Sequence, residues 1–535
     1  MRRFLLLPVT FFLLGALHSS ETVGQVIFET EILLYENEAW YGGAVGIGER
    51  MPFAASFGEF DLSRQNANNQ NVPLLISSSG RYIWSDRPFS FERRDRSLVV
   101  RSHHEIIEPV TAGRTLREAY MAAMRKHFPP SGKRPPEEFF TAPQYNTWIE
   151  LAYDQNQRDI LRYAEGIVAS GLPAGVLMID DNWMRYYGNF DFRAEKFDDP
   201  RGMVERLNEM GFRVMLWVCP FVSPDSPEYR YLAARGFLLR RPNFDAPGVI
   251  EWWNGQSACY DMTNPAAREH FIVQLRRLQT DYGIDGFKLD AGDPGFYNPA
   301  RVRGFDPDAL SVDHTQAWAE IGLEFPFNEY RACWKMGNQP LVQRLGDKHH
   351  AWWAVESLIP QMTAAGLLGY AFTCPDMIGG GQYDSFHGAR AVNIDQRQFV
   401  RSAQVHALMP MMQFSAAPWR LLDDEHQAAI LAAVGLRERF LSYIMELARA
   451  AADGGEPIVR HMEYAFPHEG FAECRDQFML GDRFLVAPVV TPGDSRTVRL
   501  PRGRWRDDMG RTHRGGTTIT IDAPLARIPY FERIN

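Results

Sequence analysis

The chain has 535 residues, 45% hydrophobic residues and a formal net charge of -9. This length is sufficient for one large domain with one or two smaller β domains. The charges are spread along the chain, which argues against nucleic acid or an anionic membrane surface as a partner. A small neutral substrate fits this composition better.

Residues 1–20, MRRFLLLPVTFFLLGALHSS, have the layout of a secretory signal peptide. A basic start precedes an apolar run of about fourteen residues and a small polar exit. The run is shorter than the roughly 20 residues that a spanning helix needs. We therefore expect a secreted or periplasmic protein with no membrane contact after signal removal, and a membrane anchor stays open as the alternative.

The five cysteines show no CxxC or metal-ligand spacing. An odd number leaves at least one thiol unpaired within the chain. The sequence therefore predicts neither a disulfide framework nor a metal site, although a single bridge stays open.

Residues 26–135 are predicted to form an N-terminal β-sandwich followed by a linker. Short alternating stretches such as QVIFETEILLY, GRYIWS and SLVVRS are separated by turn-rich segments, which is typical of antiparallel strands. A helical stretch, LREAYMAAMRKHF, and the proline-rich PPSGKRPPEE then lead to the next domain.

Residues 140–453 alternate strand-like and helical segments. GVLMIDD, FRVMLWV and IDGFKLD read as strands, and PRGMVERLNEMG and NPAAREHFIVQLRRLQTDYG read as amphipathic helices between them. This alternation over about 300 residues predicts a catalytic (β/α)₈ TIM barrel. Residues 454–535 return to short β segments such as DRFLVAPVV and TTITID, which predict a small C-terminal β-sandwich.

Three strand-like segments end in acids: MIDDNW with Asp180 and Asp181, GFKLDAGD with Asp290 and Asp293, and VQRLGDKHHAWW with Asp347. Because the carboxyl ends of barrel strands build the active site, we expect these acids to meet at one mouth. Paired carboxylates suit glycoside hydrolysis, in which one attacks the anomeric carbon and the other protonates the departing oxygen. No HxH or HExxH pattern accompanies them, which argues against a metal.

Lys288 precedes Asp290 by two residues and shares its strand face. A positive charge there would help to keep Asp290 ionised, as a nucleophile must be. Any single acid at a strand end can instead cap a helix or pair with an arginine.

The chain resembles glycoside hydrolase family 31, a family of α-glucosidases, α-xylosidases and some α-galactosidases. It is most similar to the branch containing the myogenesis-regulating glycosidase. The similarity spans roughly residues 30 to 535 and is carried by AWYGG, QYNTWIEL, LMIDDNW, LWVCPFVSPDS, WWNG, DGFKLDAGD, SLIP, GLLGY, PDMIGG and DQFMLGDRFLVAPV.

The resemblance implies that Asp290 is the nucleophile and Asp347 the general acid/base. Many family members show Trp-Thr-Gly-Asp where this chain has RLGD ending at Asp347. An arginine that touches the sugar lies sixteen positions before the acid/base in the family, and Arg331 has that spacing. By the same analogy, the substrate-binding residues are Asp180, Asp181, Trp217, Trp253, Lys288, Arg331 and Trp352.

Two departures from the family pattern put strict α-glucosidase specificity in doubt. Cys219 replaces an aspartate that is common after the third strand, and Ser415 stands where α-glucosidases carry a sugar-binding histidine. The tryptophans in the predicted pocket are individually as consistent with a core role as with sugar binding.

The resulting expectation is a retaining, exo-acting α-glycosidase that acts on terminal α-galactosides or α-glucosides by double displacement, without a cofactor. A catalytically silent carbohydrate-binding protein on the same barrel and an α-transglycosylase are the alternatives.

Overall fold

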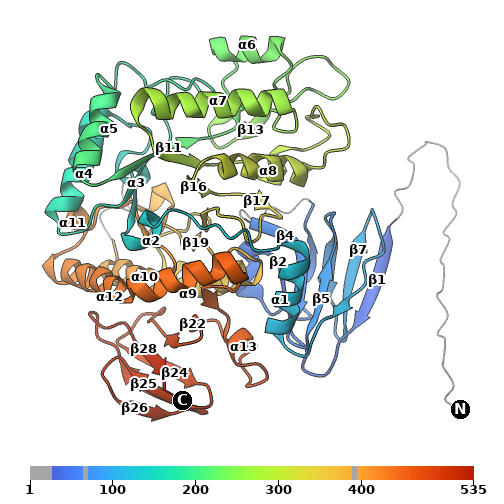
Figure 1. The fold of residues 1–535 in the computed structure, drawn as a ribbon, viewed down its shortest axis with the longest axis vertical. Coiled ribbons are helices and arrows are strands. Elements are labelled where there is room, and N and C mark those ends of the chain that lie inside the picture. The colour runs from blue at the N-terminus through green and yellow to red at the C-terminus, as the bar shows by residue number, and fades with distance from the viewer. Residues whose placement is uncertain (1–26, 64–69, 388–393, 535) are drawn as a thin grey trace, which may run out of the picture.

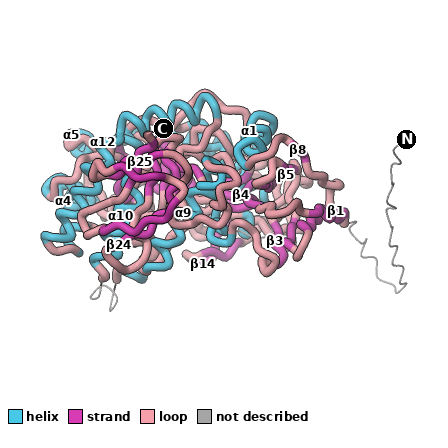
Figure 2. The backbone as a smooth tube through the Cα atoms, turned by 90° about the horizontal axis from the view of Figure 1, so that it is seen from below, coloured by secondary structure: helices cyan, strands magenta, loops and turns pink. Residues whose placement is uncertain are grey.

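A computed structural model describes residues 27–63, 70–387 and 394–534 of the chain. The predicted signal peptide, residues 1–20, lies outside the described residues. Figure 1 shows a central body of strands and helices, with one strand-rich domain at one end and another beneath it. Figure 2 shows the molecule from below, with the strands of the N-terminal domain again at one end. Over the described ranges, no helix combines the length and apolar character needed to cross a membrane.

Two sheets build the N-terminal domain. One runs in the order β1-β7-β6-β3 and the other in the order β17-β4-β5-β8, with β2 paired to β4. The strands are β1 (Phe28–Leu33), β2 (Trp40–Ala44), β3 (Gly58–Asp61), β4 (Gln70–Ser77), β5 (Arg81–Trp84), β6 (Ser90–Arg93), β7 (Ser97–Ser102), β8 (Val110–Thr111) and β17 (Cys333–Trp334). A Cβ added at Gly43 on β2 would lie 3.1 Å from the ring of Phe91 on β6, so the two sheets pack face to face.

The predicted barrel is confirmed. Eight parallel strands follow the order β19-β18-β16-β15-β11-β10-β9-β20, and the bridge between Met377 and Gln413 brings the two edges together. The strands are β9 (Gln144–Asn146), β10 (Val176–Ile179), β11 (Arg213–Val218), β15 (Gly286–Leu289), β16 (Phe327–Tyr330), β18 (Gln343–Arg344), β19 (Thr373–Cys374) and β20 (Gln413–Phe414).

Helices surround this barrel, as Figure 1 shows. They are α2 (Glu138–Thr141), α3 (Trp148–Leu151), α4 (Gln157–Ala169), α5 (Pro200–Glu209), α6 (Pro227–Ala234), α7 (Pro265–Tyr282), α8 (Ser311–Glu320), α9 (Trp352–Leu367), α10 (Gln396–Ala407), α11 (Pro418–Leu421) and α12 (Asp424–Gly454). Short strands β12 (Phe221–Val222), β13 (Ile250–Trp252) and β14 (Gly255–Cys259) form a small sheet after β11. The 3₁₀ turns are η1 (Val45–Arg50), η2 (Pro294–Phe296), η3 (Ile321–Glu324) and η4 (Tyr383–Ser385).

Helix α7 shows how the sequence sets the element boundaries. Asn264 caps its first turn by accepting from the backbone N–H of Ala266, and Pro265 occupies the first helical position, where no N–H is needed. Gly283 ends the helix in the left-handed region, with φ of 76°. This helix coincides with the segment predicted from NPAAREHFIVQLRRLQTDYG.

The C-terminal domain consists of a six-stranded sheet, β21-β22-β23-β28-β25-β26, and a two-stranded one, β24-β27. Its elements are β21 (Val459–Arg460), α13 (Met462–Ala465), β22 (Phe478–Leu480), β23 (Phe484–Val486), β24 (Ser495–Leu500), β25 (Arg504–Asp507), β26 (Thr512–Arg514), β27 (Thr517–Asp522) and β28 (Tyr530–Arg533). The predicted linker helix is α1 (Leu116–His127).

The N-terminal domain also packs tightly against the barrel. A Cβ at Gly48 in η1 would lie 2.5 Å from the carbonyl oxygen of Pro360 in α9, so only glycine fits there without movement. Strand β17 follows barrel strand β16 in the chain yet pairs with β4 of the N-terminal domain. These contacts fix one side of the barrel mouth against the N-terminal sheets.

Candidate active site

The acids predicted from the sequence lie just after the carboxyl ends of their strands. Asp180 follows β10, Asp290 follows β15, and Asp347 comes three residues after β18. Parallel strands β10 and β15 flank β11, so Asp180 and Asp290 come from nearby positions on one rim. This placement agrees with the expected barrel mouth.

Asp290 is buried and held by two donors. The Trp217 indole Nε1 donates to its Oδ2 at 2.8 Å, and the backbone N–H of Ala291 donates to its Oδ1 at 2.9 Å. Burial raises the pKa of this carboxyl, but Lys288, Arg331 and the Trp217 hydrogen bond outweigh burial and leave the pKa below its usual value. Asp290 is therefore an ionised carboxylate, the form that a nucleophile requires.

Lys288 forms its direct contact with Asp180. Its ammonium Nζ donates to Asp180 Oδ2 at 2.6 Å, and both side chains are buried. Lys288 thus acts on Asp290 through its field rather than through a hydrogen bond. Asp180 also accepts from the backbone N–H of Asp181, and its own N–H donates to Thr147 Oγ1, so its orientation is fixed on both sides.

Asp181 faces a polar pair from a different loop. Asn254 Nδ2 donates to Asp181 Oδ2 at 2.7 Å, and the Tyr187 hydroxyl donates to the same oxygen at 3.3 Å. Burial, together with the nearby charge of Asp180, raises the pKa of Asp181 to about 7. Its Oδ1 is buried without a hydrogen-bond partner. A substrate hydroxyl is a suitable partner for this oxygen.

Arg331 lies between acids and an aromatic ring. Its Nε donates to Asp293 Oδ2 at 3.1 Å, and its guanidinium lies 5.1 Å from the ring centroid of Trp253. Trp253 is 44% exposed, so its ring remains available to solvent. The pKa of Arg331, lowered by burial, is raised overall by Asp293, Asp290 and Asp347, which places its charge within reach of both predicted catalytic acids.

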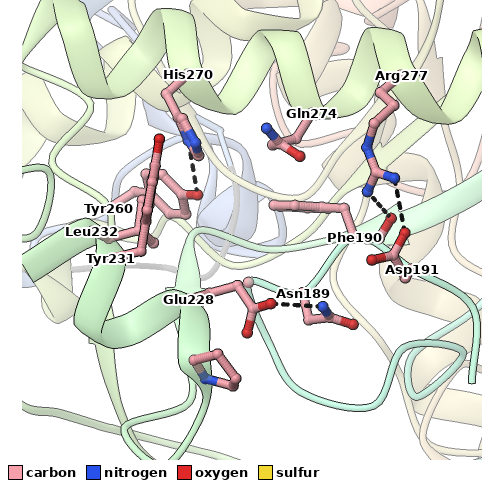
Figure 3. A pocket seen from close by; sticks show the side chains of 12 residues that line it. Asn189, Phe190, Asp191, Glu228, Tyr231, Leu232, Tyr260, His270, Gln274 and Arg277 are labelled. Carbon is pink, nitrogen blue, oxygen red and sulfur yellow. Dashed lines mark hydrogen bonds and ion pairs between the residues drawn. The ribbon is translucent and has the colours of Figure 1, made fainter.

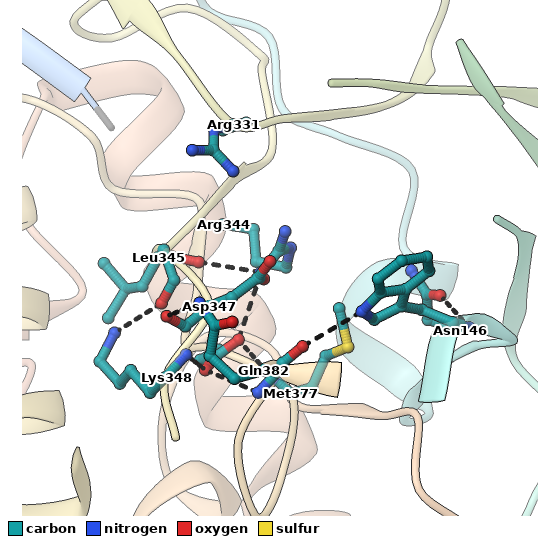
Figure 4. Close-up of polar contacts among 12 residues, drawn as sticks. Asn146, Arg331, Arg344, Leu345, Asp347, Lys348, Met377 and Gln382 are labelled. Carbon is teal, nitrogen blue, oxygen red and sulfur yellow. Dashed lines mark hydrogen bonds and ion pairs between the residues drawn. The ribbon is translucent and has the colours of Figure 1, made fainter. Parts of the chain in front are cut away.

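Asp347 is held by Arg344, a residue that the sequence pattern did not assign to the site. Arg344 Nη1 donates to Asp347 Oδ1 at 2.6 Å and to Asp376 Oδ1 at 3.2 Å. Figure 4 shows Arg344 and Asp347 close together with Arg331 nearby. The Asp347 side chain is 25% exposed whereas Arg344 is buried, so the acid can meet a substrate from the solvent side.

Asp376 supports the loop that carries Asp347. It accepts from the backbone N–H groups of Lys348 at 2.6 Å, Met377 at 2.7 Å and Gly381 at 3.1 Å. Burial raises its pKa to about 6, although Lys348 and Arg344 lower it. Its oxygens are used within the loop, which makes Asp376 a structural support.

A charged layer closes the barrel beneath these residues. Arg344 Nε lies 3.3 Å from Glu329 Oε1, and Gln413 Nε2 donates to Glu329 Oε2 at 2.6 Å. All three side chains are buried. This layer connects β16, β18 and β20 and supports the acids above it.

Three further residues named in the sequence analysis are Trp352, predicted to bind substrate, and the two departures from the family pattern, Ser415 and Cys219. The Trp352 indole donates to Asp395 Oδ2 at the start of α10. Ser415 is buried and accepts from the backbone N–H of Ile149. Cys219 is buried, and the nearby charges of Asp181 and Asp290 add to the effect of burial in raising its thiol pKa.

All five cysteines are free thiols: Cys219, Cys259, Cys333, Cys374 and Cys474. Among the described residues, no three or more His, Cys, Asp or Glu side chains gather as a metal site would require.

Sequence reasoning overlooked three further residues around the acids: Tyr153, Tyr187 and Asn254. Asn254 lies within the quoted motif WWNG, so its position was available as a signal. It accepts from the Tyr153 hydroxyl at 2.8 Å and donates to the Tyr187 hydroxyl at 2.8 Å. The sequence offered no motif that identifies the two tyrosines, because their hydrogen bonds with Asn254 join segments about 70 to 100 residues apart.

Sequence models of a known family match most of the chain. Residues 139–447 match the glycosyl hydrolases family 31 TIM-barrel domain, and residues 455–535 match the glycosyl hydrolase family 31 C-terminal domain. The myogenesis-regulating glycosidase of Mus musculus is 33% identical over 444 residues, which cover 80% of this chain and 61% of that protein. An alpha-xylosidase of Emericella nidulans is 26% identical over 91% of this chain and 65% of its own length.

Solved structures share the fold. A GH31 dextranase of Flavobacterium johnsoniae, complexed with glucose, has a TM-score of 0.82 at 20% identity and covers 95% of this chain and 66% of that one. A GH31 alpha-xylosidase from a soil metagenome, complexed with xylose, has a TM-score of 0.81 at 22% identity, covering 96% and 80%. The chain spans half to two thirds of the length of the first curated relatives it matches. The protein belongs to glycosyl hydrolase family 31.

Proposed function

We propose that the protein is a retaining, exo-acting α-glycosidase with Asp290 as nucleophile and Asp347 as general acid/base. The observation that carries this proposal is the contrast between the two acids. Asp290 is a buried carboxylate that basic residues and Trp217 hold in its charged form. Asp347 is partly exposed at the rim, where a leaving group can reach it.

In the first step, a carboxylate oxygen of Asp290 forms a bond to the anomeric carbon as the bond to the leaving oxygen breaks. Asp347, which enters this step protonated, gives its proton to that oxygen. The product is a glycosyl ester of Asp290 and a free alcohol. Arg331, whose charge is within reach of both acids, favours the carboxylate form of Asp290, which is the form that attacks.

In the second step, Asp347 takes a proton from water, and the water oxygen attacks the anomeric carbon. The ester bond breaks and Asp290 is again a carboxylate. Two inversions at one carbon retain the α configuration. This two-step reaction requires the two carboxyl groups to lie about 5 to 5.5 Å apart with substrate bound.

We assign binding of the terminal sugar of the substrate to Asp180, Asp181 and Lys288. These buried polar groups line one side of the cluster, and the free Oδ1 of Asp181 provides an acceptor for a hydroxyl. Trp253 and Tyr153, each 44% exposed, give aromatic faces near the same residues for the rest of the substrate. A terminal α-galactoside or α-glucoside is the proposed substrate.

The substrate choice draws on both relatives and residues. Curated relatives include proteins named alpha-glucosidase 2 and alpha-xylosidase, so family members differ in the sugar they accept. Cys219 and Ser415 replace residues expected of an α-glucosidase, and this favours the α-galactoside. A panel of aryl α-glucoside, α-galactoside, α-xyloside and N-acetyl-α-galactosaminide decides among them.

The test of the proposed reaction is Asp290→Ala. We expect kcat on the preferred aryl α-glycoside to fall by about 10⁴-fold or more, as for loss of a covalent nucleophile. Asp293→Asn is the matched control, because Asp293 is also buried in the loop after β15, but its side-chain hydrogen bond within the described part of the chain goes to Arg331. Near-normal turnover of Asp290→Ala would remove Asp290 from its role.

We also propose that the protein is exported, on the basis of its first twenty residues. Expression of the full chain with detection of the processed N-terminus in the extracellular or periplasmic fraction tests this. An unprocessed chain retained inside the cell would contradict it.

A further inference from the structure

A cavity of about 260 Å³ lies outside the carboxylate cluster, between the loop after β10 and helices α6 and α7. Figure 3 shows its side chains. None of its lining residues belongs to the proposed catalytic set. They are Gly188, Asn189, Phe190, Asp191, Pro227, Glu228, Tyr231, Leu232, Tyr260, His270, Gln274 and Arg277.

Helix α7 presents one face to this cavity. His270, Gln274 and Arg277 have the spacing that places side chains on the same side of a helix. In Figure 3 they project from α7 toward Asn189 and Glu228, which come from the opposite side. The cavity is therefore lined by polar groups on two facing walls.

Two of these polar side chains have hydrogen-bonding atoms without a protein partner among the described residues. Glu228 Oε1 accepts from Asn189 Nδ2 at 2.8 Å, but Glu228 Oε2 is buried with no hydrogen-bond partner. The Gln274 side-chain amide has no hydrogen bond to any described residue, and Figure 3 draws none. A buried acceptor without a donor is costly, so its presence beside a cavity points to a ligand that donates.

The other polar groups are already paired. Arg277 Nη1 donates to Asp191 Oδ1 at 2.9 Å, and the Tyr260 hydroxyl lies 3.3 Å from His270 Nδ1. Glu228 is thus the one lining carboxylate without a cation, which disfavours an anionic ligand. No group of three or more His, Cys, Asp or Glu side chains in the described ranges is placed to hold a metal ion, which disfavours a metal ligand here.

The apolar part of the lining consists of the rings of Tyr231, Tyr260 and Phe190 together with Leu232 and Pro227. Tyr231 is 44% exposed, so its ring is the accessible one and leaves the cavity open to solvent at that side, whereas Tyr260 and Phe190 are buried behind it. Ring faces match the C–H faces of a pyranose, and a hydroxyl can donate to a carboxylate while accepting from an amide. A volume of about 260 Å³ suits a ligand of one ring.

We propose that this cavity is a second carbohydrate-binding site, which holds one sugar ring through hydrogen bonds to Glu228 and Gln274. The proposal rests on the cavity itself and does not depend on the reaction proposed for Asp290 and Asp347.

The cavity is connected to the proposed sugar-binding residues by a short segment. Gly188 and Asn189 directly follow Tyr187, whose hydroxyl contacts both Asp181 and Asn254. Gly188 has φ of +86°, and a Cβ there would lie 3.0 Å from Val222, so this backbone has little freedom. A ligand in the cavity therefore touches the segment that positions Tyr187.

The test measures sugar binding with turnover disabled. In the Asp290→Asn protein, D-glucose, D-galactose and D-xylose serve as probes in saturation-transfer NMR titrations, and crystals are soaked with the sugar that binds best. We expect density for a sugar ring between Glu228 and Gln274. Adding Gln274→Phe should abolish the signal from this site, because the ring fills the cavity, whereas Val273→Phe on the exposed side of α7 should leave the signal unchanged.

Glu228→Gln is a second test variant, which keeps the shape of the side chain and removes its negative charge. It should weaken binding at the cavity by about tenfold through loss of a charge-assisted hydrogen bond, whereas Glu269→Gln, which changes an exposed carboxylate on α7, should not. Identical titrations for all four variants, or density only at the barrel mouth or only at crystal concentrations, would overturn the proposal. Hydrolysis assays on Gln274→Phe with Asp290 intact report the proposed reaction separately.

Discussion

The indole of Trp217 donates a 2.8 Å hydrogen bond to the carboxylate of Asp290. Trp217 lies near the carboxyl end of β11, where it pairs with Lys288 of β15 in the parallel register. Adjacent strands thus provide both the hydrogen bond and the positive charge that favour the ionised form of Asp290.

Replacing Trp217 should change the pH dependence of the reaction. Loss of a donor to the charged form raises the pKa of Asp290, so activity should be lost earlier as the pH falls. In Trp217→Phe, we expect the acidic limb of kcat/KM to move up by about one pH unit. Trp505→Phe is the control, because this buried indole donates to the carbonyl of Pro501 in the C-terminal domain. An unchanged acidic limb in Trp217→Phe would contradict the assignment.

Asp181 should make stability depend on pH. Its pKa in the folded protein is raised to about 7, above the value of about 4 in an unfolded chain. The stabilising contribution of the protonated form is therefore complete below pH 4 and is lost as the pH rises through 7. Asp181→Asn removes this dependence, so relative to wild type it should gain about 3 kcal/mol between pH 4.5 and 8. Denaturant titrations at both pH values measure the difference; a constant difference would show that Asp181 ionises normally.

Arg344 should be essential to the fold of the barrel mouth. It lies among Glu329, Asp347 and Asp376, all carboxylates, and is itself buried. Arg344→Met leaves buried charges uncompensated and should cost about 3 to 5 kcal/mol of unfolding free energy. Glu329→Gln in the same protein should restore part of this loss, which a double-mutant cycle detects. Additive effects of the two substitutions would show that the pair does not interact.

Gly381 should control the position of Asp347. A Cβ at Gly381 would lie 2.8 Å from Asp347 Oδ1 and 2.8 Å from Asp376 Oδ1. Gly381→Ala should therefore displace the acid/base and lower kcat by at least about tenfold, because proton transfer needs close geometry. Gly435→Ala within α12 has open space around it and should leave kcat unchanged. Equal kcat values in the two variants would argue against a catalytic role for Asp347.

The barrel and the position of its acids followed from sequence, because strand and helix periods alternate and acids end the strands. The partners of those acids did not follow as readily. Lys288 was expected to help keep Asp290 ionised, and its charge does lower the pKa of Asp290, but its hydrogen bond to Asp180 on the far side of β11 was not foreseen. Arg344 was read as a departure from a motif, although it is the residue that holds Asp347.

Contacts between distant segments were the least accessible from sequence. Asn254 joins Tyr153, Tyr187 and Asp181 through three loops whose meeting point is set by packing. The same holds for β17, a two-residue strand within the barrel segment that pairs with the N-terminal β4. Short strands of this kind carry too few residues for a periodic signal.

The covalent intermediate is the most direct test of the central claim. A 5-fluoro-α-glycosyl fluoride of the preferred sugar should glycosylate the nucleophile with loss of fluoride, and the resulting glycosyl ester should hydrolyse slowly, so that it accumulates. Mass spectrometry of peptides from the trapped protein should place one glycosyl group on Asp290, and the released product should keep the α configuration. Label on another residue, or release of the β anomer, would contradict the assignment of Asp290 as the nucleophile of a retaining enzyme.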